Sequence, residues 1–227
     1  MKRKWSFIGL FLLILTVDLV FKNYEHLAAY RLVSKPLVII SLLTHYYFNS
    51  KHFDKDVRKP MIIALILLIT GDLFFLGFDN DIFFNIGFVA FMVANFFYFK
   101  SFLTNTAFNY KLLIPFWVIC GVYFFVMLSY LYTELDLYLM PMMIFFIVMV
   151  SMANVALMRY KVVNNTSFYL VFIGTLCYLY SISLIGFDKF NMPVKYQYTL
   201  EMASYGIGHL LIVLGMLTEK VQKEITV

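Results

Sequence analysis

The sequence predicts an all-α, polytopic integral membrane protein with about eight transmembrane helices in a single domain, residues 1–227. Hydrophobic residues make up 63% of the chain and charged residues 14%, which leaves too few polar side chains to cover a water-soluble globule. The apolar residues also gather in segments of about 20 residues, the length that crosses a bilayer. These segments lie near residues 5–21, 32–49, 60–78, 82–103, 112–132, 137–158, 166–187 and 197–217.

Basic residues predict the orientation of the spans. An even number of spans places both termini on one side of the membrane, and Lys and Arg collect on the cytoplasmic side. We therefore expect a multi-pass protein of a bacterial inner membrane with both termini in the cytoplasm, and the net charge of +5 requires no nucleic-acid partner. Of the 18 Lys and Arg residues, the side opposite the termini holds only Lys22, Arg31, Lys35, Lys189 and Lys195.

The first two segments carry polar residues near their outer ends. The first has the charged head of a signal sequence but no small-residue cleavage site, so we interpret it as a retained helix. Asp18 lies near its outer end, where we expect the carboxylate to reach water rather than line a site. Lys35 opens the second segment beside Pro36, and its ammonium group either extends to the headgroups or turns inward to hold a phosphate or carboxylate.

Asp72, inside the third segment, is the most informative polar residue. An ionised carboxylate among Leu, Ile and Phe is costly, so an intramembrane aspartate is a candidate functional residue. The alternative is a protonated side chain that only hydrogen-bonds a neighbouring helix. On the fourth segment Phe91, Asn95 and Tyr98 share one helix face, and Asn95 is deep enough to need a hydrogen-bond partner.

The fifth and sixth segments carry little information, whereas the seventh and eighth resemble the third and fourth. Leu-Gly-Phe-Asp at 76–79 recurs as Ile-Gly-Phe-Asp at 185–188, which predicts two parallel four-helix halves. The same alignment pairs Asp72 with Ser181.

On the eighth segment Glu201, Tyr205 and His209 follow at spacings of four and form one polar stripe, which favours a lined cavity. Under the predicted topology, six polar residues fall in the outer half of the bilayer and are expected to share one pocket: Lys35, Asp72, Ser181, Ser183, Glu201 and Tyr205.

Three short words resemble the YhhN-like lysoplasmalogenase family: Lys35-Pro36-Leu37, Gly71-Asp72, and Gly-Phe-Val-Ala-Phe-Met-Val-Ala-Asn-Phe-Phe-Tyr at 87–98. The similarity extends more weakly over all eight segments. The resemblance implies a multispanning protein that hydrolyses the vinyl ether bond of lysoplasmalogen, releasing a fatty aldehyde and a glycerophospho-headgroup. The residues that the resemblance carries over are Lys35, Asp72, Tyr98, Ser181 and Tyr205.

Three positions depart from the family pattern. Ile182 stands where the family has the aspartate of a Ser-Asp pair, Asn95 where a histidine is usual, and His209 where a glutamine is usual. Vinyl ether hydrolysis needs an acid that protonates the β-carbon and a group that stabilises the resulting cation or activates water. We expect Asp72 to be the acid, and the second role to pass to Glu201, His209 or Asp18, of which Glu201 is the best candidate because it lies in the same outer half. The expected substrate-binding residues are Lys35, Asn95, Tyr98, Ser181, Tyr205 and His209.

Two other functions compete with the hydrolase. A catalytically inactive lipid-binding or regulatory protein would explain the loss of the second aspartate, and parallel repeats are also found in transporters. Cys120 and Cys177 lie in apolar segments and form no disulfide or zinc pattern, and there is no nucleotide-binding or Gly-x-Ser-x-Gly motif. We therefore expect no metal or cofactor and a membrane lipid as the substrate, while the oligomeric state is left open.

Overall fold

The computed structural model describes residues 2–77, 80–135, 138–189 and 194–221. In these ranges the chain forms eight long α-helices and two short 3₁₀ turns. Their bounds are α1 Lys2–Asn23, η1 Glu25–Tyr30, α2 Arg31–Asn49, α3 Lys55–Phe74, η2 Phe75–Gly77, α4 Asp81–Leu103, α5 Tyr110–Leu135, α6 Leu139–Met158, α7 Asn165–Lys189 and α8 Gln197–Leu217.

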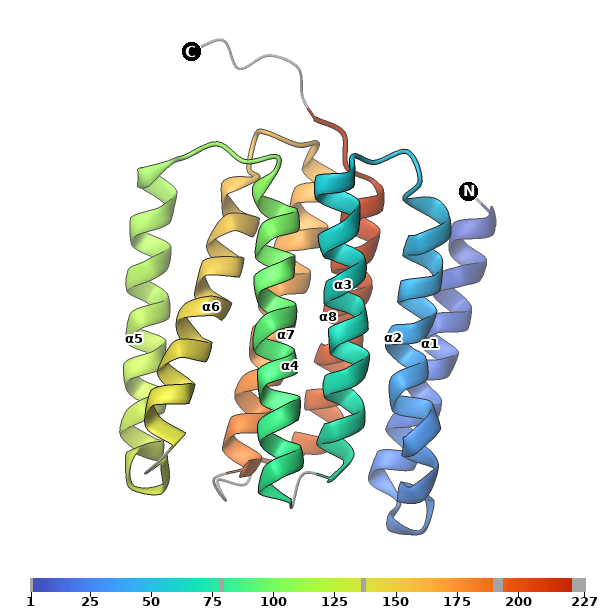
Figure 1. The fold of residues 1–227 in the computed structure, drawn as a ribbon, viewed down its shortest axis with the longest axis vertical. Helices are drawn as coiled ribbons and strands as arrows, with labels where there is room; N and C mark the ends of the chain where they lie inside the picture. The colour runs from blue at the N-terminus through green and yellow to red at the C-terminus, as the bar shows by residue number, and fades with distance from the viewer. Residues whose placement is uncertain (1, 78–79, 136–137, 190–193, 222–227) are drawn as a thin grey trace.

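All eight helices are long and apolar enough to cross a membrane, which confirms the predicted all-α polytopic fold. The predicted segments agree with the helices to within a few residues at each end. Successive helices run in opposite directions, so that the start of α1 and the end of α8 lie at the same end of the bundle (Figure 1). We call this the terminal end, and the other the far end.

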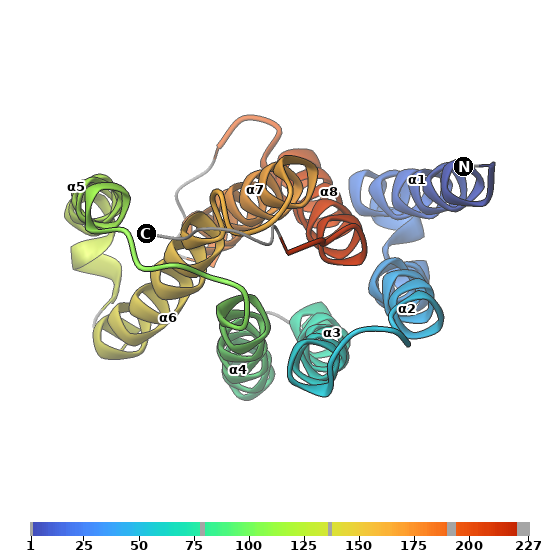
Figure 2. The same ribbon diagram turned by 90° about the horizontal axis from the view of Figure 1, so that it is seen from above.

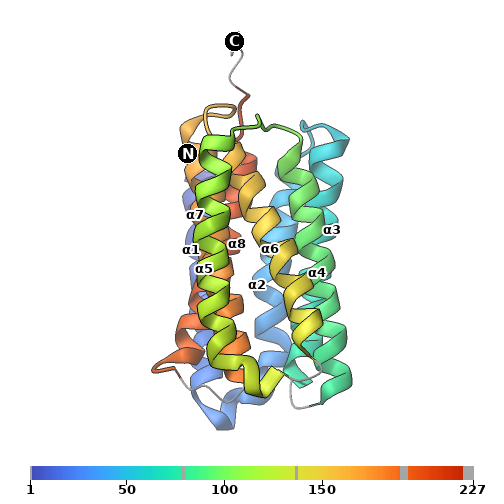
Figure 3. The same ribbon diagram turned by 90° about the vertical axis from the view of Figure 1, so that its left-hand side faces the viewer.

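Seven of these helices form a closed ring in the order α1, α2, α3, α4, α6, α7 and α8, and α8 returns to α1 (Figure 2). α8 also packs against α2 and has the largest buried share of the eight spans. α5 stands outside the ring against α6, and its span is the least buried (Figure 3). The polar stripe of α8 therefore faces the middle of the bundle.

Glycines allow the two most closely packed helix pairs to approach. Between α7 and α8, a Cβ added at Gly208 would lie 2.8 Å from the carbonyl oxygen of Gly174. Between α3 and α4, Gly71 and Gly87 have close neighbours on the opposite helix. Small residues at such contacts are the usual means of close helix packing in membranes. The similarity of the two pairs fits the predicted relation between halves, which stays a prediction because residues 78–79 of the shared word lie outside the described ranges.

A buried ion pair fixes the end of α8 at the terminal end of the bundle. Arg159, after α6, lies 2.7 Å from the Glu219 carboxylate and donates to the Ser167 hydroxyl on α7. Asn105 also donates to Glu219, and Ser167 donates to the backbone carbonyl of Gly215. Burial lowers the pKa of the Arg159 guanidinium, and the charge of Glu219 opposes this shift. The cluster therefore connects α6, α7 and α8 at the terminal end of the bundle, beyond the polar stripe of α8.

Candidate functional site

A charged pocket of about 240 Å³ lies near the far end of the bundle. It is formed by α1, α2 and α8 together with the short turns η1 and η2 and the end of α7. Three basic and two acidic side chains contribute to its wall. The lining residues are Lys22, Ala28, Arg31, Lys35, Phe75, Leu76, Ile185, Asp188, Tyr198 and Glu201.

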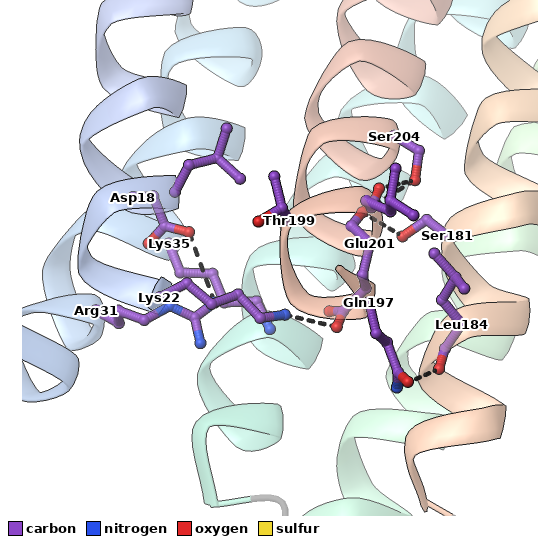
Figure 4. A network of polar contacts seen from close by, with 12 residues as sticks. Asp18, Lys22, Arg31, Lys35, Ser181, Leu184, Gln197, Thr199, Glu201 and Ser204 are labelled. Carbon is purple, nitrogen blue, oxygen red and sulfur yellow. Dashed lines mark hydrogen bonds and ion pairs between the residues drawn. The ribbon is translucent and has the colours of Figure 1, made fainter. Parts of the chain in front are cut away.

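An ion pair between Lys22 and Glu201 joins α1 to α8 across this pocket (Figure 4). Lys22 Nζ lies 2.5 Å from Glu201 Oε2, and each side chain is 9% exposed. Ser181 on α7 donates a hydrogen bond of 2.9 Å to the backbone carbonyl of Glu201. The Glu201 carboxylate is thus held at the pocket wall by α1, while its backbone is fixed by α7.

Asp18 forms a second buried charge cluster, and the expectation that it reaches water was wrong. Its carboxylate is fully buried, with Ser34 Oγ donating to Oδ1 at 2.5 Å and the Arg31 guanidinium 3.6 Å from Oδ2. The reason is the rotation of α1, which turns Asp18 toward α2 instead of toward the membrane surface. Arg31 is held beside the pocket by this contact (Figure 4).

Asp72 lies behind the pocket wall and contacts two of the predicted site residues. Tyr205 Oη donates to Asp72 Oδ2 at 2.8 Å, and Lys35 Nζ lies 3.5 Å from Oδ1. The lysine side chain is 7% exposed and Asp72 is fully buried. Lys35 therefore turns inward, which decides between its two sequence-based interpretations. Lys35 and Phe75 both line the pocket, and Lys35 Nζ lies 5.9 Å from the centre of the Phe75 ring, whereas Asp72 is not among the lining residues.

The polar stripe of α8 continues this contact toward the middle of the bundle. The Tyr205 ring stands edge-on to the His209 ring with 4.5 Å between centroids, and Tyr98 Oη lies 3.1 Å from His209 Nδ1. His209 is fully buried, and its Nε2 has no hydrogen-bond partner in the described part of the chain. Lys35, Asp72, Tyr205, His209 and Tyr98 thus form one file of buried polar groups from α2, α3, α4 and α8.

Three other predicted residues lie apart from that file. Asn95 is fully buried beside Tyr178, and neither side chain makes a well-formed hydrogen bond within the described residues. Ser181 is used in its contact with the Glu201 backbone, and Ser183 bonds to its own helix. Of the six residues expected to share a pocket, only Lys35 and Glu201 line it.

The two candidate carboxyl groups, Asp72 and Glu201, make no contact with each other in the described structure. Each is paired with a different lysine. No group of three His, Cys, Asp or Glu side chains in the described ranges is placed to hold a metal ion. The arrangement offers a buried carboxyl group paired with a lysine of the pocket wall, and a second carboxylate on that wall.

Sequence reasoning did not select Lys22 and Arg31 as candidate site residues, because it considered both only as basic residues on the side opposite the termini. One signal was available. Asp18 and Lys22 are four residues apart and therefore share one face of α1, the same spacing that marked the stripe on α8. An inward-facing Asp18 would have predicted an inward-facing Lys22.

The profile of the YhhN family matches residues 30–216 of the chain, from the end of η1 to the end of α8. The matched region holds both carboxyl groups, the buried file and most of the pocket wall, whereas Asp18 and Lys22 on α1 precede it. The chain has no significant match among curated proteins or among solved structures.

Proposed function

Because the chain belongs to the YhhN family, we propose that it is a lysoplasmalogenase-like hydrolase that cleaves the vinyl ether bond of a single-chain ether lipid. The observation that carries the proposal is the setting of Asp72. Its Oδ2 is fixed by Tyr205, while its Oδ1 accepts no hydrogen bond from the described residues and lies 3.5 Å from Lys35 Nζ. One oxygen is thus oriented by the protein, and the other is left for the reaction.

Lys35 couples the protonation of Asp72 to the binding of substrate. In the structure Lys35 neutralises Asp72, and a carboxylate paired with a lysine holds no proton to give. A lipid phosphate in the pocket competes for the same ammonium group, and Lys22 and Arg31 stand beside it. When Lys35 turns to the phosphate, Asp72 keeps the hydrogen bond from Tyr205 but loses its counter-ion, and it takes up a proton from solvent because the neutral acid is the favoured form among apolar side chains.

The reaction then follows from the substrate's chemistry. Asp72 gives its proton to the β-carbon of the vinyl ether, and the double bond becomes an oxocarbenium ion. Water adds to the carbon next to oxygen, and the proton that it loses goes to the Asp72 carboxylate, leaving a hemiacetal. The hemiacetal collapses to a fatty aldehyde and the free hydroxyl group of the glycerophospho-headgroup. Glu201, on the pocket wall, is the second negative charge available to stabilise the cation.

The test is aldehyde release from 1-alkenyl-lysophosphatidylethanolamine and 1-alkenyl-lysophosphatidylcholine by the purified protein. We expect equal amounts of aldehyde and headgroup product, and a loss of about 10²–10⁴-fold in Asp72→Asn. Asp56→Asn is the matched control, because Asp56 lies on the same helix and is exposed.

Two results would reject parts of the proposal. Full activity in Asp72→Asn would remove Asp72 as the acid. If the folded wild-type protein releases no aldehyde, the hydrolase is rejected and a lipid-binding protein remains. That alternative is also favoured by Ile182, which replaces the second aspartate of the family.

A further inference from the structure

The charged pocket is the first of three adjacent cavities. Phe75 and Ile185 line both this pocket and a narrow cavity of about 40 Å³ behind it. Met142, Phe145 and Ile182 line both that narrow cavity and a larger one of about 320 Å³. The three cavities therefore follow one another from the charged groups to an apolar space, with only shared side chains between them.

The largest cavity of this series lies between α5, α6 and α7. Its wall includes Phe116 and Tyr123 from α5, Phe146 from α6, and Tyr180 from α7, and it contains no charged side chain. α5 is the helix outside the ring and packs mainly against α6 (Figures 2 and 3). The cavity therefore lies at the side of the bundle where a loosely packed helix separates it from the surrounding lipid.

We propose that this cavity binds the hydrocarbon chain of the lipid whose headgroup occupies the charged pocket. The inference rests on the proposed function, since it places the two ends of that substrate. The narrow cavity between them is only slightly larger than the ~30 Å³ that one water molecule occupies in the liquid. It leaves room for no more than one extended chain, whose reactive first carbons would lie near Phe75, one helical turn from Asp72.

We select this cavity over a larger groove of about 760 Å³ between α1, α2 and α8, because only the cavity adjoins the charged pocket through shared lining residues of the narrow cavity. That groove is lined by residues such as Phe7, Leu37 and Leu214, and none of its lining residues reaches the charged pocket. It runs along α2 from Leu37 to Asn49, at the terminal end of the bundle. A chain lying there would occupy a groove that shares no lining residue with the headgroup pocket.

The path gives Ile182 a role. This residue, at the position of the second family aspartate, lines both apolar cavities where they meet. An isoleucine there contacts a hydrocarbon chain without a desolvation cost, whereas an ionised carboxylate among the same phenylalanines would be penalised. Ile182 is therefore assigned to the wall of the chain path.

Affinity alone cannot test this assignment, because a chain that leaves the bilayer for an apolar cavity exchanges one hydrocarbon environment for another. The position of the chain can be measured directly. The probe is a 1-O-alkyl-lysophosphatidylethanolamine with a diazirine at the end of its saturated chain, which has no vinyl ether to hydrolyse. Full-length protein in phosphatidylcholine vesicles is irradiated with the probe, and the labelled residues are identified by mass spectrometry.

We expect labels on α5, α6 and α7 that excess unlabelled lipid suppresses. Suppressible labels in the groove of α1, α2 and α8 would overturn the proposal, and so would labels spread over all lipid-facing surfaces without suppression. In Ile182→Trp we expect labelling of α5 to α7 to fall about tenfold, as steric exclusion from an apolar pocket allows. Leu37→Trp, which places the same side chain in the other groove, should leave it unchanged.

The labelling pattern of the wild-type protein tests the proposal even if Ile182→Trp fails to fold. Failure of the chain site and failure of the hydrolase are also distinguishable. Suppressible labels on α5 to α7 without aldehyde release keep the site and reject the reaction. Aldehyde release with labels elsewhere keeps the reaction and rejects the site.

Discussion

At the scale of single residues, Tyr205 orients the proposed acid. It donates to one oxygen of Asp72 and leaves the other facing Lys35. Removing the hydroxyl in Tyr205→Phe should lower kcat for aldehyde release by about ten- to a hundredfold, because a hydrogen bond to a charged group contributes about 1.5–3 kcal/mol. KM should change little, since Tyr205 does not line the pocket.

Tyr46→Phe is the control for this substitution. Tyr46 is equally buried, but its hydroxyl group has no hydrogen-bond partner in the described ranges. We expect its kcat to stay near that of the wild type. Equal kcat values in Tyr205→Phe and wild type would show that the hydrogen bond to Asp72 has no part in the reaction.

Asp72 could be selected as a candidate site residue from the sequence alone, because a carboxyl group in an apolar run stands out. The neighbours of Asp72 were not. A lysine near the end of a span can reach headgroups or the interior, and only the placement of α2 against α3 turns Lys35 inward. The same limit explains the error at Asp18, because the direction in which a helix face points is a tertiary property.

At the scale of helices, the Lys22–Glu201 ion pair links α1 to α8. Both side chains are largely buried, so Lys22→Met and Glu201→Gln should each destabilise the protein by about 3–5 kcal/mol by leaving one charge unpaired. The double variant should cost less than the sum of the two. Thermal unfolding in detergent measures these three values.

Activity separates the structural role of Glu201 from its proposed chemical one. If Glu201 stabilises the cation, Glu201→Gln and the double variant should both show a low kcat, even where stability is regained. A double variant with restored kcat would reduce Glu201 to an anchor for Lys22.

The contact between α7 and α8 depends on glycine. In Gly208→Ala the new methyl group would lie 2.8 Å from the Gly174 carbonyl oxygen and 3.0 Å from the Tyr178 backbone nitrogen, so the helices must separate. We expect a destabilisation of about 1–3 kcal/mol, as overpacked interiors show. Gly121→Ala on α5 is the control, because a Cβ there meets nothing within 4 Å. Equal melting temperatures of the two variants would contradict this account.

The positions of the helices along the chain were predictable, while their neighbours were not. Mean hydropathy and length locate each span, since a bilayer sets both. Hydropathy places both α5 and α8 in the membrane but does not say that α5 lies outside the ring, whereas the polar stripe of α8 indicates that this helix faces other helices. Lipid and protein interiors are alike to such helices, so shape and a few polar contacts select the partners.

At the scale of the whole molecule, the structure sharpens the argument for orientation. Three of the five basic residues at the far end, Lys22, Arg31 and Lys35, line the pocket and pair with carboxylates instead of facing headgroups. At the far end, only Lys189 and Lys195 then remain as basic residues that influence the orientation of the spans. The terminal end should therefore face the cytoplasm, and the charged pocket should open toward the outer leaflet.

Cysteine labelling in intact cells tests this orientation. In a background of Cys120→Ala and Cys177→Ala, a membrane-impermeant maleimide should label Lys195→Cys without permeabilisation. It should label His52→Cys, in the exposed connection between α2 and α3, only after the membrane is opened. The reverse pattern would invert the topology, and the headgroup pocket would then draw its lipid from the cytoplasmic leaflet. The charged pocket lies near the far end of the bundle, opposite the terminal end. The same measurement therefore also shows which leaflet would supply the substrate.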